Sequence, residues 1–121
     1  MNDERLFEEI ERLKAVYGAV CVSSEPSTPK LLQVGQAPLP RGCAPGKTKV
    51  LLRIMPGQPR PEVFVQPGIK LPNGKEPRST SVVLIAGQDW LQFSYSFPWD
   101  ETQNTLDHFV ATALRRFAKN E

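Results

Sequence analysis

The sequence predicts an α+β fold in which a helix near each end of the chain packs on an antiparallel sheet. Apolar residues recur at helical spacing in both terminal regions, whereas several segments between them alternate with the two-residue period of strands. The chain has too few strand–helix–strand units for a parallel sheet. Its 121 residues fit a single domain, which we expect to span residues 1–121.

The first element is predicted to be a helix over residues 3–17. Asn2 or Asp3 can cap its N-terminus, acidic residues crowd its first turns, and Gly18 supplies a stop. The apolar stripe consists of Leu6, Ile10, Leu13 and Tyr17. This stripe predicts the face that the helix buries.

Strands are expected next. Residues 19–23 are rich in valine and end at a serine- and proline-containing turn, and residues 31–34 return as a hairpin partner. Residues 35–46 contain three prolines and three glycines, which predicts a loop without a regular element. Residues 48–55 alternate between apolar and mixed positions, as a central strand with one buried face does.

Proline then dominates the middle of the chain, since nine of the twelve prolines lie between residues 38 and 77. A short extended run at residues 63–65 and a second apolar run at residues 82–86 stand out between these breaks. The aromatic-rich segment 90–99 has no decisive periodicity. We therefore expect a meander of about four strands followed by an irregular segment.

The last element is predicted to be an amphipathic helix packed on the sheet. Asp100, Thr102 or Asn104 can cap it, and basic residues suit its C-terminal end. Its apolar stripe consists of Leu106, Phe109, Val110, Ala113, Leu114 and Phe117.

Several kinds of site are disfavoured by composition. Two cysteines and one histidine are too few for a four-ligand zinc site, so no metal or cofactor is expected. Two reduced thiols are favoured over one disulfide, with Cys21 in the core. No glycine spacing matches a phosphate-binding loop, and His108 has no evident catalytic partner, which favours a surface position for it.

No stretch of about 18 apolar residues is present, and residues 1–11 are acidic where a secretory signal is basic and then apolar. The expectations are therefore no membrane span and a cytoplasmic location.

Charge is distributed unevenly along a chain of net charge +2. Residues 30–78 hold nine basic and two acidic side chains, whereas residues 1–29 have a balance of −3. The basic segment 30–78 is compatible with nucleic acid or an acidic protein, or with solvated lysines alone. The aromatic block from Trp90 to Trp99 is expected mainly to close the core, with Tyr95 or a tryptophan edge exposed.

An ordered series of short motifs resembles a bacterial branch of the ubiquitin-conjugating enzyme superfamily, prokaryotic family E. The motifs are Pro38-Leu39-Pro40, the run from Val50 to Pro59, Val63-Phe-Val-Gln-Pro67, Lys70-Leu-Pro-Asn-Gly74, Trp90-Leu-Gln-Phe-Ser94 and Pro98-Trp99. They span nearly the whole chain. The resemblance implies the ubiquitin-conjugating-enzyme-like fold, with an N-terminal helix, an antiparallel meander, an irregular segment and a C-terminal helix.

The resemblance also implies a thioester-forming cysteine about eight residues before a tryptophan. Counting back from Trp99 reaches Leu91, and no cysteine lies between Asn73 and the C-terminus. Asn73 matches the family's oxyanion asparagine, but Leu71 stands where the family has a histidine. Ser96 replaces a histidine typical of family E. A catalytically inactive chain is expected.

Our first hypothesis is an adaptor or structural subunit in a bacterial ubiquitin-like modification system, of a kind used in antiviral defence. The implied partners are a ubiquitin-like protein on the sheet face and an activating-enzyme-like protein near the first helix. The acidic first helix departs from the basic surface that conjugating enzymes usually present there. The candidate contacts are Lys47, Lys49, Arg53, Tyr95 and Trp99.

Two alternatives remain open at this point. Cys43, in the proline-rich loop, is a candidate displaced nucleophile of an active conjugating enzyme. A nucleic-acid-binding module that uses residues 30–78 is the other. An unrelated α+β protein accounts for the remainder.

Overall fold

A computed structural model describes residues 3–22, 30–54, 61–77, 80–85, 87–93 and 105–118. Within these ranges the chain forms two α-helices, a six-stranded antiparallel sheet and a closing 3₁₀ turn. The elements are α1 (Asp3–Tyr17), β1 (Val20–Val22), β2 (Lys30–Pro38), β3 (Lys47–Ile54), β4 (Glu62–Val65), β5 (Thr80–Ile85), β6 (Gln88–Phe93), α2 (Leu106–Leu114) and η1 (Arg115–Ala118). The predicted α+β class is confirmed.

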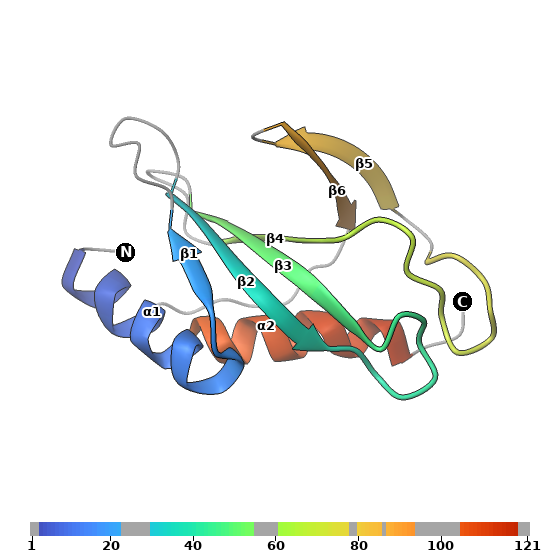
Figure 1. Cartoon of the computed structure of the whole chain (residues 1–121), viewed down its shortest axis with the longest axis horizontal. Helices are drawn as coiled ribbons and strands as arrows, with labels where there is room; N and C mark the ends of the chain where they lie inside the picture. Colours follow the sequence, from blue (N-terminus) through green and yellow to red (C-terminus); the bar gives the residue numbers. More distant parts are fainter. Residues whose placement is uncertain are drawn as a thin grey trace.

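The sheet order is β1-β2-β3-β4-β6-β5, so the hairpin β5–β6 joins the meander through its second strand. Both helices lie beneath the same face of β1, β2 and β3, whereas the β5–β6 hairpin stands at the top of the view, away from them (Figure 1). The strand pairs Phe64↔Gln92 and Val65↔Leu91 connect this hairpin to β4.

The main core lies between the helices and the sheet. Leu13 of α1 and Val110 of α2 are fully buried, as are Leu32 and Leu52 on the sheet face that they cover. A second cluster occupies the opposite face, where Leu51, Phe64 and Trp90 are buried. The first helix has the predicted bounds, and the predicted core position of Trp90 is confirmed.

Three expectations about the strands were wrong. Residues 35–38 belong to β2, because a register shift between Val34 and Ala37 lets the strand continue past Gly35, with Pro38 at its end. Strand β3 buries both faces, since Leu51 packs in the second cluster. The segment expected to be irregular holds the β5–β6 hairpin, which raises the strand count to six.

Cys21 is exposed rather than in the core, since it lies on the edge strand β1 on the side away from the helices. His108 is exposed, as expected. The helix α2 begins after Thr105, whose side chain makes no capping hydrogen bond. The three predicted capping residues, Asp100, Thr102 and Asn104, lie outside the described residues.

Candidate partner-binding site

The position implied for a thioester nucleophile lies inside a strand. Leu91 pairs with Val65 on one side and with Val82 on the other, and only 8% of its surface is exposed. A leucine side chain has no group that can attack a carbonyl carbon. Leu91 therefore supplies packing rather than chemistry.

Asn73 stabilises the turn after β4. Its side-chain oxygen accepts a hydrogen bond from the Lys75 N–H at 3.0 Å, which is an Asx turn. The following Gly74 has a φ of +82°, a value that favours glycine. The side-chain oxygen of Asn73 is thus engaged locally.

Cys43 is half-buried in the loop between β2 and β3. Its thiol donates a hydrogen bond to the Phe117 carbonyl oxygen at 3.3 Å, which links this loop to η1. Burial raises the pKa of Cys43 above its ordinary value, so less of it is thiolate at neutral pH. These properties favour a packing role for Cys43 over a nucleophilic one.

This geometry predicts slow alkylation of Cys43. In a Cys21→Ser variant, which leaves Cys43 as the one remaining cysteine, we expect iodoacetamide to react about tenfold more slowly at pH 7.5 than with a cysteine in an unfolded peptide. The rate should rise with pH toward the raised pKa. Alkylation faster than that of the peptide thiol would contradict the packing role and favour an activated nucleophile.

Arg53 is committed to contacts within the sheet. Its guanidinium donates two hydrogen bonds to the Glu62 carboxylate, at 2.8 and 2.9 Å, and its Cζ lies 5.1 Å from the centre of the Phe64 ring. The hydrogen bond to Glu62 raises the pKa of Arg53. Because its charge is already paired, Arg53 is a weaker candidate for a partner contact than the lysines of the same strand.

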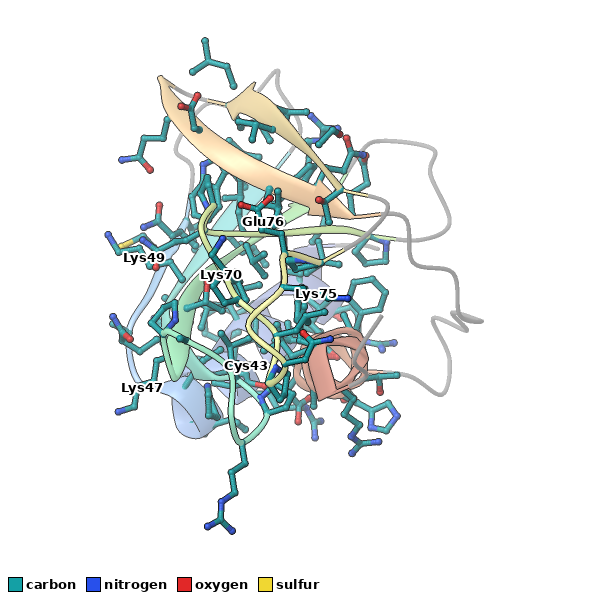
Figure 2. The ribbon with its side chains drawn as sticks, turned by 90° about the vertical axis from the view of Figure 1, so that its right-hand side faces the viewer. Cys43, Lys47, Lys49, Lys70, Lys75 and Glu76 are labelled. Atoms are coloured by element: carbon teal, nitrogen blue, oxygen red, sulfur yellow. The ribbon has the colours of Figure 1, made fainter. Side chains whose placement is uncertain are left out.

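Five cations lie on the loops after β2 and β4 and at the start of β3, and we name this surface the basic end. It consists of Arg41, Lys47, Lys49, Lys70 and Lys75. Figure 2 shows the four lysines spread across the side that holds the loops after β2 and β4, with Cys43 among them. Arg41, Lys47 and Lys75 are exposed, and Lys49 and Lys70 are half-buried.

Hydrogen bonds hold the segments of the basic end together. Ala44 and Lys70 exchange two of them, at 3.1 and 2.8 Å, which fixes the loop after β2 against the loop after β4. Gln66 ties the second loop to β3, because its amide oxygen accepts from the Lys49 N–H and its own N–H donates to the Thr48 hydroxyl. The two loops and β3, which carry the cations, are therefore held in fixed positions relative to one another.

Glu76 is the one acidic side chain among the described residues of these two loops. Its carboxylate lies 2.9 Å from Lys70 Nζ, and this hydrogen bond lowers the pKa of Glu76. The pair is exposed and contributes little to stability. With Glu76 counted, the basic end keeps a formal charge of +4.

The helix α1 presents the opposite charge. Arg5 lies 3.4 Å from the buried Glu9, and Arg12 lies 4.0 Å from both Glu9 and Asp107, so both arginines face acidic groups. Glu4 and Glu8 remain exposed. The exposed surface of α1 is therefore acidic, as the sequence predicted.

Within the described ranges, no three His, Cys, Asp or Glu side chains gather as metal ligands do. No helix there is long and apolar enough to cross a membrane. Of the five predicted contacts, Lys47 and Lys49 lie on the basic end, Arg53 is paired with Glu62, and Tyr95 and Trp99 lie outside the described residues.

Sequence reasoning did not single out Arg41, Lys70 or Lys75 as contacts. The positive balance of residues 30–78 included them, but the bridge that joins the loop of Arg41 to the loop of Lys70 and Lys75 is a long-range contact. No family model, no curated protein and no solved structure matches this chain.

Proposed function

We propose that this chain is a non-catalytic adaptor that resembles ubiquitin-conjugating enzymes and binds an acidic protein partner through its basic end. The order of its motifs supports a place in a bacterial ubiquitin-like modification system. The partner would be a ubiquitin-like protein, or an activating enzyme of the same system. Either partner would be bound without transfer of the modifier to this chain.

The observation that carries the proposal is a basic end whose loops are joined by hydrogen bonds, together with an unreactive side chain at the implied thioester position. Five cations project from two hydrogen-bonded loops and the start of β3, and one carboxylate, Glu76, is paired among them. The implied thioester position holds the buried Leu91, and the thiol of Cys43 is engaged with the Phe117 carbonyl oxygen. Such a surface offers charge complementarity to an acidic partner.

Reversal of charge on β3 tests the proposal. We expect Lys47→Glu combined with Lys49→Glu to weaken binding of a ubiquitin-like protein from the same genome by about tenfold or more. Both substitutions replace a positive charge by a negative one, which would repel an acidic partner. Isothermal titration at two salt concentrations measures this. The wild-type affinity should fall as salt screens the interface, and the variant should show a weaker salt dependence.

Lys14→Glu is the matched control, since it makes the same kind of charge change on α1, where Lys14 pairs with Glu11. It should leave the affinity unchanged. Equal binding by the wild type and the β3 variant would contradict the proposal. Tight, salt-dependent binding to single-stranded nucleic acid, without binding to the protein partner, would overturn it in favour of a nucleic-acid-binding module.

A further inference from the structure

Strand β5 is an open edge of the sheet. It ends the strand order and pairs only with β6 among the described strands. Natural sheets commonly protect such an edge with charged residues, proline or a bulge. The six residues of β5, Thr80–Ile85, include no charged residue and no proline, and their pairing with β6 has no register shift.

The strand also exposes apolar side chains. Val82 is 58% exposed and Leu84 is 71% exposed, and both lie on the sheet face that carries Leu91. Leu84 is the most exposed of the large apolar side chains described. Burial of these side chains against an apolar partner strand would be favourable, because it removes apolar surface from water.

A pocket of about 310 Å³ opens on the same face beside the first half of β5. Thr80 and Val82 line it from the strand, and Ile69, Pro77 and Leu91 line it from the body of the protein. Glu76 is the one charged residue of its lining, and that carboxylate is paired with Lys70. The pocket is therefore suited to an apolar side chain.

The backbone groups of β5 alternate between β6 and the open side. Two residues separate the paired Ile85 and Gln88, and the pair that closes such a short hairpin is hydrogen-bonded. The N–H and C=O groups of Ile85 and Val83 thus point to β6. Those of Thr80, Val82 and Leu84 point outward.

We infer that β5 pairs with β5 of a second copy, antiparallel and about a two-fold axis at Val82. This register sets Val82 opposite Val82 and Thr80 opposite the Leu84 of the other copy. It uses the outward N–H and C=O groups of all three residues. The inference concerns self-association and does not depend on the proposed adaptor function.

Self-complementarity favours a second copy over an unrelated strand. The exposed Leu84 of one copy lies opposite Thr80, at the pocket of the other, and the symmetry repeats this contact. No charged residue of β5 meets a like charge, because the strand has none. The hairpin stands away from α1 and α2, so neither helix covers its edge (Figure 1).

The first test is sedimentation of the whole chain over a range of concentrations. We expect a reversible dimer, whose dissociation constant rises by about tenfold or more in Val82→Lys and in Leu84→Lys. Val16→Lys is the matched control, because Val16 on α1 is 55% exposed, close to the exposure of Val82, and it should dimerise as the wild type does. A chain that stays monomeric at all concentrations would overturn the inference.

Disulfide cross-linking tests the register in a Cys21→Ser background. Val82→Cys should form a disulfide dimer readily, because the axis brings residue 82 within about 5.5 Å of its copy. Leu84→Cys should not, since the two copies of residue 84 would be about 13 Å apart along the strands. Equal cross-linking of both variants, or none of Val82→Cys, would contradict the two-fold pairing.

Discussion

Glu9→Ala is expected to destabilise the protein by about 2–3 kcal/mol. Glu9 lies on α1, but its carboxylate caps the other helix: Oε2 accepts a hydrogen bond from the Leu106 N–H, at the first turn of α2, at 3.3 Å. The side chain is buried, and Arg5 and Arg12 supply the compensating charge. The positive end of the α2 dipole favours a negative charge at this position. The Glu9 carboxylate, which is carried by α1, therefore also holds the N-terminus of α2.

Chemical denaturation followed by circular dichroism measures this loss. Glu9→Gln keeps an oxygen acceptor for Leu106 but removes the charge, so we expect it to be intermediate between the wild type and Glu9→Ala. Glu8→Ala is the control, since Glu8 is its exposed neighbour and should change stability by less than about 0.5 kcal/mol. Equal effects of Glu8→Ala and Glu9→Ala would show that the cap is unimportant.

Phe64→Ala is expected to lower the free energy of unfolding by about 3–5 kcal/mol, the range for removal of a large aromatic side chain from a core. Phe64 is fully buried with Leu51 and Trp90, and Arg53 stacks over its ring. It also pairs with Gln92, one of the two registered pairs that connect β4 to β6. The substitution should therefore loosen the attachment of the β5–β6 hairpin.

Hydrogen exchange distinguishes this local effect from global destabilisation. We expect the amides of β6 that pair with β4 to lose more protection than those at the β2–β3 pairing. Phe64→Leu, which retains most of the apolar volume, is the matched control and should cost less. A uniform loss of protection across the sheet would contradict a special role for Phe64 in holding the hairpin.

Local pattern was sufficient for much of the fold. The spacing of Leu6, Ile10, Leu13 and Tyr17 predicted α1 with the bounds observed. Pattern failed where pairing with a neighbouring strand outweighs local preference, since β3 holds residues 35–38 in β2 despite Gly35 and Pro38. Cys21 is exposed for a similar reason, because an apolar run on an edge strand need not be covered on both faces.

The site was less accessible to sequence reasoning because long-range contacts assemble it. The absence of a thiol near Leu91 is visible in the sequence, and so is the positive balance of residues 30–78. The bridge between Ala44 and Lys70 is not, nor is the contact of Cys43 with Phe117, 74 residues away. Likewise, the sequence predicted Arg53 as a candidate contact, but only the fold shows that Glu62 pairs with Arg53.

The most direct test of the adaptor proposal combines the binding titration with intact-mass measurement. The wild-type chain would be incubated with the ubiquitin-like protein of its genome, the cognate activating enzyme and ATP. The proposal predicts a complex that survives purification while the mass of this chain stays unchanged. A reducible increase by the mass of the modifier, abolished by Cys43→Ala, would contradict it and identify an active conjugating enzyme.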